Sequence, residues 1–275
     1  MFEVREWTRE DTARFVRVPS AEDDKYARGV VALRTGSAAY PGAAVLGVEA
    51  AWRAGAGFVR YVGPERVVDA VLARRPETVA GAGHSRIDAW VIGSGTDASQ
   101  RSEEESAALR RILADATPVV IDAGALDLAA DARAPFVVTP HAREFARLQD
   151  RLGAPPSDEG RAEAARRVAA ELHGIVLLKG ARTLIAAPDG TVFAVAAGTG
   201  WLATAGTGDV LGGVLGAVIA ANPGAPLAEL AAAGAWLHGH AARIAADVQD
   251  GGPGHPIVAL DVAEALPFAI ADVLA

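Results

Sequence analysis

The stretch ATAGTGDVLGGVLGAVIAAN, residues 203–222, places one acidic side chain, Asp209, in a glycine-rich setting. An apolar helical pattern follows the turn Gly206-Thr207-Gly208-Asp209, so the free N–H groups and positive end of a helix face whatever occupies this turn. Glycines let the backbone approach an anion without an intervening Cβ and let successive N–H groups converge. The stretch therefore predicts a phosphate site at a helix N-terminus.

A carboxylate beside an anion site repels the phosphate, so Asp209 needs its own explanation. In a catalytic interpretation, Asp209 takes the proton from a hydroxyl that attacks phosphorus. In a structural interpretation, Asp209 is the N-cap of the helix, and Gly212, Gly213 and Gly216 allow close helix packing. The stretch alone leaves both open. It is neither a Walker A motif, which needs Gly-Lys-Ser/Thr, nor a dinucleotide fingerprint, which directly follows a strand.

The composition restricts the classes of protein to consider. A chain of 275 residues with 51% hydrophobic residues suits one large α/β domain over 1–275. The absence of cysteine excludes disulfides, thiolate metal sites and cysteine nucleophiles. A net charge of −8 without a basic block argues against a nucleic-acid surface. A charged N-terminus and the lack of an apolar run of about 18 residues predict a cytoplasmic protein without a membrane span.

Short apolar runs alternate with helical patterns along the chain. The runs are apolar on both faces, which is typical of strands in a parallel sheet covered by helices. The segment TLIAAPDGTVFAV, centred on Asp189-Gly190, predicts a hairpin that extends the sheet in antiparallel fashion. The predicted buried strands are 89–93, 118–122, 136–139 and 174–179, and the predicted helices are about 42–55, 100–115, 142–152, 158–172, 209–222, 226–248 and 260–273.

Polar residues and glycines follow the predicted strands, and ligands of such sheets bind outside the carboxyl ends of the strands. Asp122 could be a loop cap or a carboxylate that faces a metal or a substrate, so it has no assigned role. His238 and His240 do not predict a metal site, because residues two apart on a helix do not face each other. The segments expected at this edge are 93–97 (GSGTD), 122–124 (DAG), 139–141 (TPH) and 179–183 (KGART).

Six ordered motifs resemble those of the ADP-dependent NAD(P)H-hydrate dehydratases, a family of the ribokinase-like superfamily. The resemblance covers nearly the whole chain. It implies a three-layer α/β/α sandwich with a mostly parallel central sheet and an antiparallel hairpin at one end. Two segments depart from the family pattern: GSGTD at 93–97 and TGW at 199–201. The motifs are KYARGVV (25–31), GSAAYPGAAVLGVEAAWRAGAGFVRYV (36–62), VVIDAGAL (119–126), VVTPHAREFARL (137–148), LLKGARTLIAAPDG (177–190) and LATAGTGDVLGG (202–213).

The resemblance implies a repair reaction on hydrated NADH or NADPH, called NADHX and NADPHX, in the S epimer. The ring hydroxyl accepts the terminal phosphoryl of ADP, AMP is released, and phosphate then leaves to restore NADH or NADPH. Asp209 would take the hydroxyl proton, while the N–H groups of Gly206 to Asp209 would stabilise the transferring phosphoryl. Mg²⁺ would screen the polyphosphate charge. The family also implies a homotetramer and a separate NAD(P)HX epimerase.

Site residues can be carried over from the family motifs by position. Structural interpretations compete with several of them: Lys179 as a solvated strand-end lysine, His141 as a partner of the loop backbone, and Ala43 as a helix-packing residue. No metal ligand is assigned. The resemblance implies nucleotide binding by Lys179, Gly180, Ala181, Arg182, Thr183 and Gly208, substrate binding by Ala43, Gly95, His141 and Asp209, and catalysis by Asp209, Gly206 and Gly208.

Two other functions could use the same residues. A small-molecule kinase of the same superfamily, of the thiazole or hydroxymethylpyrimidine type, would use the glycine-rich turn and its acid identically. The motifs TPHAREF and YPGA argue against a kinase. A nucleotide sensor would bind ADP without turnover, and it would gain nothing from a base such as Asp209 beside a phosphate. The sequence decides neither ADP against ATP nor NADHX against NADPHX.

Overall fold

The computed structural model describes residues 2–81, 83, 86–154, 160–248 and 252–275. Within these residues one ten-stranded sheet has the order β1-β10-β9-β8-β7-β6-β5-β2-β3-β4. Neighbouring strands are parallel except in the pairs β8–β9 and β9–β10, which are antiparallel. The strands are β1 Val4–Glu6, β2 Val30–Arg34, β3 Phe58–Tyr61, β4 Val79–Ala80, β5 Ala89–Ile92, β6 Val119–Ile121, β7 Phe136–Val138, β8 Ile175–Leu178, β9 Thr183–Ala186 and β10 Val192–Val195.

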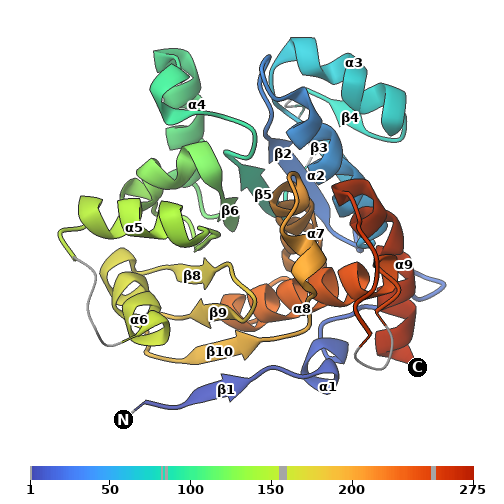
Figure 1. The fold of residues 1–275 in the computed structure, drawn as a ribbon. Coiled ribbons are helices and arrows are strands. Elements are labelled where there is room, and N and C mark those ends of the chain that lie inside the picture. The colour runs from blue at the N-terminus through green and yellow to red at the C-terminus, as the bar shows by residue number, and fades with distance from the viewer. Residues whose placement is uncertain (1, 82, 84–85, 155–159, 249–251) are drawn as a thin grey trace.

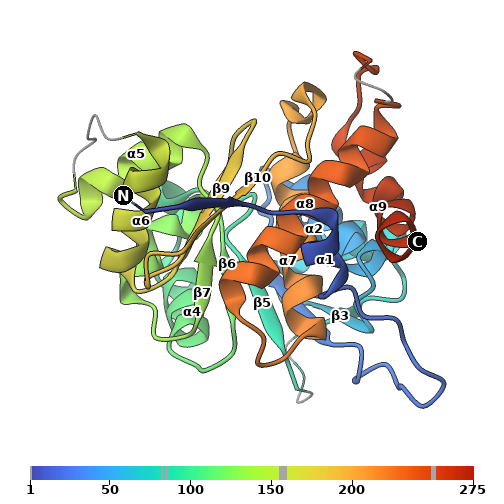
Figure 2. The same ribbon diagram turned by 90° about the horizontal axis from the view of Figure 1, so that it is seen from below.

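Helices cover both faces of the sheet, which gives three layers (Figure 1). Figure 2 shows α4, α5 and α6 on one side and α7, α8 and α9 on the other. In the described ranges, no helix combines the length and the apolar composition needed to cross a membrane. The helices are α1 Arg9–Ala13, α2 Pro41–Arg53, α3 Glu65–Arg74, α4 Glu103–Leu113, α5 Ala142–Arg151, α6 Arg161–Leu172, α7 Thr207–Ala221, α8 Leu227–Ala245 and α9 Ala259–Leu274, with 3₁₀ helices at Ala98–Gln100, Ala123–Asp131 and Gly200–Leu202.

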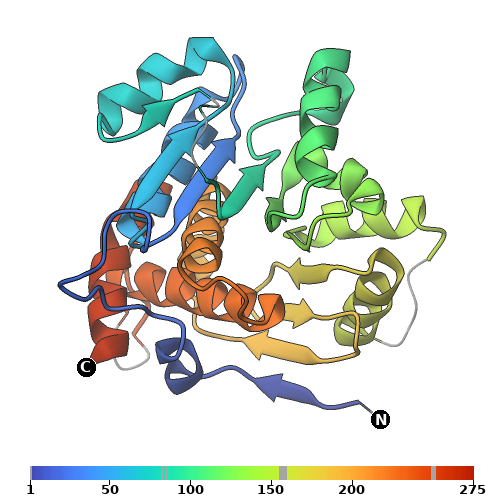
Figure 3. The same ribbon diagram turned by 180° about the vertical axis from the view of Figure 1, so that it is seen from behind.

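The central strands are apolar on both faces because each face meets its own core. Successive side chains of a strand point to opposite faces. Leu177 and Ile185 therefore join the core beneath α2, α7, α8 and α9, whereas Val176, Leu178 and Leu184 join the core beneath α4, α5 and α6. Seen from behind, α8 lies across the half of the sheet that contains the hairpin (Figure 3). The predicted strands, the hairpin and the three-layer fold are confirmed.

The predicted helices are present, and some of their ends differ from the prediction. The helix expected at 100–115 begins at Glu103, because the Ser102 hydroxyl accepts a hydrogen bond from the Glu105 N–H at 3.1 Å and caps the helix there. The helix expected at 158–172 begins at Arg161, and positions 158 and 159 lie outside the described residues. Strands β1 to β4 and helices α1 and α3 were not predicted.

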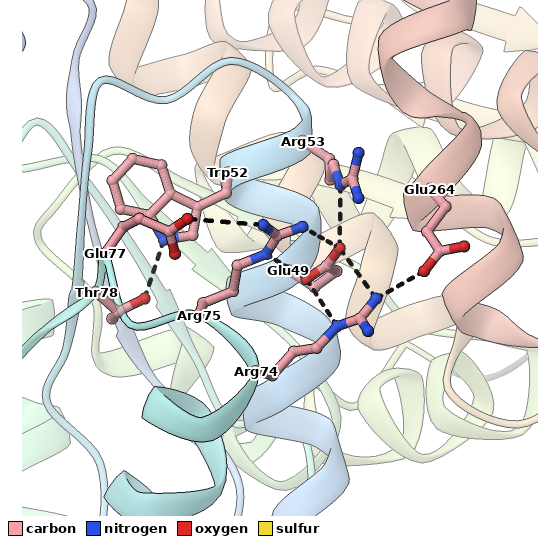
Figure 4. A network of polar contacts seen from close by, with 8 residues as sticks. All are labelled: Glu49, Trp52, Arg53, Arg74, Arg75, Glu77, Thr78 and Glu264. Atoms are coloured by element: carbon pink, nitrogen blue, oxygen red, sulfur yellow. Dashed lines mark hydrogen bonds and ion pairs between the residues drawn. The ribbon is translucent and has the colours of Figure 1, made fainter.

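A fully buried carboxylate joins α2 to its neighbours (Figure 4). Glu49 on α2 accepts hydrogen bonds from Arg53 Nε at 3.1 Å, from Arg74 Nε at 3.2 Å and from Arg75. Arg74 also donates to Glu264 on α9 at 2.7 Å. Burial alone raises the pKa of Glu49, but the hydrogen bonds from the arginines outweigh burial, so the pKa lies below its ordinary value. This charged cluster ties α2 to the end of α3 and to α9.

Candidate functional site

The segments predicted to follow the strands meet at one edge of the sheet. Strands β8, β7, β6 and β5 are consecutive neighbours and parallel from β5 to β8, so their carboxyl ends lie side by side. A cavity of about 820 Å³ opens at this edge and also reaches the start of α7. Among the residues that line it are Asp122, His141, Lys179, Gly180, Ala181, Thr183, Gly206, Thr207, Gly208, Asp209 and His238.

The glycine-rich turn has the geometry of an uncapped helix N-terminus. Gly206 is the N-cap of α7 and has a φ of 91°, a left-handed conformation that favours glycine. A Cβ on Gly206 would lie 2.6 Å from Leu46 Cδ1 and 2.9 Å from Ala259 Cβ, so a larger residue would also force its neighbours to shift. The Thr207 hydroxyl donates to the carbonyls of Leu202 and Thr204, both at 3.0 Å, which fixes the turn. The first N–H groups of α7 are left for a ligand.

Asp209 is the third residue of α7 and Gly206 is the N-cap, so the alternative interpretation of Asp209 as the N-cap is wrong. Burial raises the pKa of Asp209 to about 6, and the negative charge of Asp122 adds to this effect. The charge of Lys179 and the nearby Ser94 hydroxyl, which donates its proton to Asp122, act in the opposite direction. A carboxylate with this pKa is ionised at neutral pH and is a better proton acceptor than an ordinary aspartate.

Asp122, which had no assigned role, lies at the centre of a polar cluster built from four strand ends. It is only 4% exposed. Its Oδ1 accepts hydrogen bonds from Lys179 Nζ at 3.0 Å and from Thr139 Oγ1 at 2.7 Å, and its Oδ2 accepts one from Ser94 Oγ at 3.2 Å. Lys179 is therefore not the solvated strand-end lysine of the alternative interpretation. Ser94 and Thr139 belong to the segments 93–97 and 139–141 that were expected at this edge, but the sequence reasoning assigned no role to either residue.

The segment after β8 borders the cavity through Lys179, Gly180, Ala181 and Thr183. Arg182 has a different environment, because its side chain pairs with Glu6 on β1. Arg161, the first residue of α6, binds this segment from outside: its Nη2 donates to the Lys179 carbonyl at 3.1 Å and its Nη1 to the Arg182 carbonyl at 3.2 Å. No local pattern predicted this contact, which joins α6 to the segment after β8.

Ala43 and Gly95 lie against each other beside a second cavity. A Cβ on Gly95 would lie 2.3 Å from the Cβ of Ala43, and Gly95 has a positive φ of 66°, so only glycine fits here. Gly95 lines the second cavity, of about 470 Å³, together with Tyr40 and Arg147. Glu144 lines both cavities, which therefore adjoin.

His141 is the N-cap of α5. Its Nδ1 accepts hydrogen bonds from the N–H groups of Arg143 at 3.1 Å and Glu144 at 3.3 Å, and the Glu144 carboxylate accepts one from the His141 N–H at 2.9 Å. His141 therefore satisfies backbone groups, as the structural interpretation expected, but these groups belong to the first turn of α5 and not to a loop. Its side chain is nevertheless 50% exposed and lines the larger cavity. The capping hydrogen bonds hold the imidazole ring of His141 at the wall of the larger cavity.

The two histidines of α8 have different neighbours. His238 is buried and lines the larger cavity, and burial lowers its pKa to about 4, so its ring is neutral. His240 Nε2 lies 3.1 Å from Asp272 on α9. Within the described part of the chain, no group of three or more His, Asp or Glu side chains is arranged to hold a metal ion.

Comparisons with known proteins agree with these features. The model of the NAD(P)H-hydrate dehydratase family matches residues 31–254. The chain is 44% identical over 254 residues to the bifunctional NAD(P)H-hydrate repair enzyme Nnr of Mycobacterium leprae, which covers 89% of this chain and 51% of that protein. It is 36% identical over 243 residues to the ADP-dependent (S)-NAD(P)H-hydrate dehydratase of Neisseria meningitidis, which covers 82% of this chain and 80% of that protein.

A solved structure extends the likeness to the fold. The ADP/ATP-dependent NAD(P)H-hydrate dehydratase of Bacillus subtilis, co-crystallised with ATP/Mg²⁺, is 29% identical and has a TM-score of 0.86, covering 99% of this chain and 100% of that one. The chain spans about half the length of the bifunctional relative from M. leprae. The sheet order, the glycine-rich turn and these matches lead to one conclusion: the chain has the ribokinase-like fold and belongs to the NAD(P)H-hydrate dehydratase family.

Proposed function

We propose that this chain catalyses the ADP-dependent dehydration of (S)-NADHX and (S)-NADPHX to NADH and NADPH, with AMP and phosphate as the other products. The observation that carries the proposal is Asp209, a half-buried carboxylate with a pKa of about 6 in the first turn of a helix whose free N–H groups line a large cavity. A protein that only bound a nucleotide would gain nothing from a proton acceptor beside the phosphate-binding turn. Phosphoryl transfer to a hydroxyl needs one.

In this mechanism the terminal phosphoryl of ADP rests on the first N–H groups of α7, at Gly206 to Asp209. Asp209 takes the proton of the substrate ring hydroxyl as the hydroxyl oxygen bonds to the β-phosphorus. The bond from that phosphorus to the bridging oxygen breaks, and AMP leaves. Phosphate then departs from the ring carbon, assisted by the electrons of the ring nitrogen, and the adjacent ring carbon loses a proton to the departing phosphate or to water, which forms the ring double bond of NADH or NADPH. The helix N–H groups stabilise negative charge on the phosphoryl oxygens during transfer.

The two adjoining cavities suit two ligands of different size and charge. The larger one contains Lys179 and the turn at Gly208, as a nucleoside diphosphate requires. The smaller one contains Gly95, packed on Ala43, and it begins beside Glu144. We assign the hydrated ring to the region between them, within reach of Asp209 and His141, and the rest of the dinucleotide to the smaller cavity. Gly180, Ala181 and Thr183 line the larger cavity and are proposed to bind the nucleotide. Arg182 pairs with Glu6 instead of lining the cavity, so we propose that it contributes its backbone, not its side chain.

Mg²⁺ fits this site as a partner of the nucleotide. The described residues contain no cluster that would hold the ion alone, and Asp122 is already paired with Lys179. Protein-bound Mg²⁺ is commonly held by substrate phosphates, water and few carboxylates. When bound, the ion would neutralise part of the negative charge of the polyphosphate. The homotetramer, the separate epimerase and the cytoplasmic location remain predictions from the resemblance and the composition.

Mixing the purified protein with (S)-NADHX and ADP is expected to restore the absorbance of reduced nicotinamide and to release AMP and phosphate in equal amounts. Absorbance and chromatography of the nucleotides measure the two outputs. Parallel reactions with ATP, and with NADPHX, define the preferred pair. A protein that forms no NADH with either nucleotide, or that only phosphorylates a thiazole or pyrimidine alcohol, contradicts the proposal.

Arg161→Met is expected to weaken ADP binding about tenfold and to leave kcat nearly unchanged. The arginine holds the carbonyls of Lys179 and Arg182, and two lost hydrogen bonds of about 1 kcal/mol each would loosen the segment that contacts the nucleotide. Calorimetry of ADP binding measures the effect. Arg110→Met removes the same charge from the surface, where Arg110 pairs with Asp131, and is the control. Equal affinities in the two variants would exclude the positioning role of Arg161.

A further inference from the structure

Asp122 is a buried carboxylate that the proposed mechanism does not use. It is 4% exposed, yet it borders the cavity beside the glycine-rich turn. A Cβ on Gly208 would lie 3.4 Å from Lys179 Nζ and 3.9 Å from Asp122 Oδ2. Both charged groups therefore lie where a phosphate on this turn would meet them.

Two hydroxyl groups hold this carboxylate in one orientation. Thr139 Oγ1 donates to Oδ1 of Asp122 at 2.7 Å, and Ser94 Oγ donates to Oδ2 at 3.2 Å. The anchored carboxylate accepts from Lys179 Nζ at 3.0 Å, so the flexible lysine has one preferred position. A lysine side chain that had to be ordered during the reaction would lose rotamer freedom at that step. Here the ordering is complete before the substrates bind, which is the condition for effective electrostatic stabilisation.

We propose that Asp122 is a positioning residue for phosphoryl transfer: it holds the Lys179 ammonium against the phosphate-binding turn, and its own carboxylate borders the same cavity as Asp209. The inference rests on the proposed function for the identity of the reaction. The Ser94–Asp122–Thr139–Lys179 arrangement that supports it comes from β5, β6, β7 and β8 and does not depend on the substrate.

The charged groups around Asp122 determine in which direction the loss of its charge shifts the pKa values of its neighbours. Burial lowers the pKa of Lys179, but Asp122, Glu144 and Asp209 outweigh burial and raise it. Burial raises the pKa of Asp209, Asp122 raises it further, and Lys179 lowers it. His238, which faces the same cavity from α8, is neutral because its pKa is about 4. Loss of the Asp122 charge therefore lowers the pKa values of both Asp209 and Lys179.

Asp122→Asn tests the inference with a side chain of nearly the same shape. The pH profile of kcat/KM is expected to move to lower pH on its acid limb by about one unit, because Asp209 loses a neighbouring negative charge. The alkaline limb, set by Lys179, moves in the same direction. The maximal kcat is expected to fall about 10- to 100-fold. Asp131→Asn, which removes an exposed carboxylate of the same type, is the control and should leave the profile in place.

A second measurement needs no turnover. Carbon NMR of ¹³C-labelled aspartate carboxyls follows the titration of Asp209 directly in the wild type and in Asp122→Asn. A lower midpoint in the variant supports the inference even if NADHX proves not to be the substrate. Identical midpoints overturn it whatever the substrate is.

Thr139→Val provides an independent test if Asp122→Asn does not fold. This variant removes the 2.7 Å hydrogen bond that anchors Asp122 but keeps the charge. A loss of kcat of about three- to tenfold, with the acid limb nearly in place, is the expected result. An unchanged kcat would show that the orientation of Asp122 is irrelevant and would refute the positioning role.

Discussion

Replacement of Asp209 by asparagine is expected to lower kcat by about 10²- to 10⁴-fold while ADP still binds, as removal of a general base does. Asparagine fills the same volume in the first turn of α7, but it cannot accept the proton of the substrate hydroxyl. It also removes a negative charge beside the phosphate seat, so ADP affinity should be equal or higher. Rapid-mix measurement of AMP release, with calorimetry of ADP binding, separates the two effects.

The pH dependence of the wild type provides a second test of the same base. Asp209 has a raised pKa of about 6, so the active, ionised form dominates above this pH. The kcat/KM of the wild type should fall about tenfold per unit as the pH drops below about 6, and this limb should be absent in Asp209→Asn. Asp69→Asn, an exposed change on α3, is the matched control. A fully active Asp209→Asn would leave the carboxylate without a catalytic role.

The sequence predicted the central strands but not all of their neighbours. The segments 89–92 and 175–178 are uninterrupted apolar runs. The β3 strand contains Arg60, so its local pattern does not indicate a buried strand, whereas β2 has the apolar run VVAL at 30–33 before Arg34 and was missed despite it. The structure satisfies these charges through distant partners: Arg34 pairs with Glu105 on α4, and Arg60 donates to the Gly81 carbonyl at 2.8 Å. Contacts of that range are not visible in a local pattern.

The sequence predicted which residues belong to the candidate site, but not the hydrogen bonds that connect them. Motifs located Asp209, Lys179 and His141, and parallel topology indicated the edge at which they meet. The pairing of Lys179 with Asp122 depends on strand order and register, which join residues 57 positions apart. The start of α7 was misplaced because the capping rule favours Asp over Gly, whereas here the conformation and crowding at Gly206 decide the helix start.

Glu49→Gln is expected to lower the free energy of unfolding by about 3 to 5 kcal/mol, the effect of removing one member of a buried ionic cluster. The side chain is fully buried, so the arginines that surround it would lose their charged partner without gaining water. Chemical denaturation at neutral pH measures the change. Glu264→Gln is the control within the same cluster. Glu264 is half exposed and pairs only at the edge with Arg74, so its loss should cost less than about 1 kcal/mol.

The effect of Glu49 should also depend on pH in a defined direction. Its pKa is lowered in the folded protein, because the arginines outweigh the effect of burial. A carboxyl group of this kind stabilises the fold above its unfolded pKa, and the stabilisation disappears as the pH falls through the folded pKa. The difference in stability between wild type and Glu49→Gln should therefore be largest near neutrality and shrink in acid. A difference that stayed constant with pH would mean that packing, rather than the charge of Glu49, holds α2 against α3 and α9.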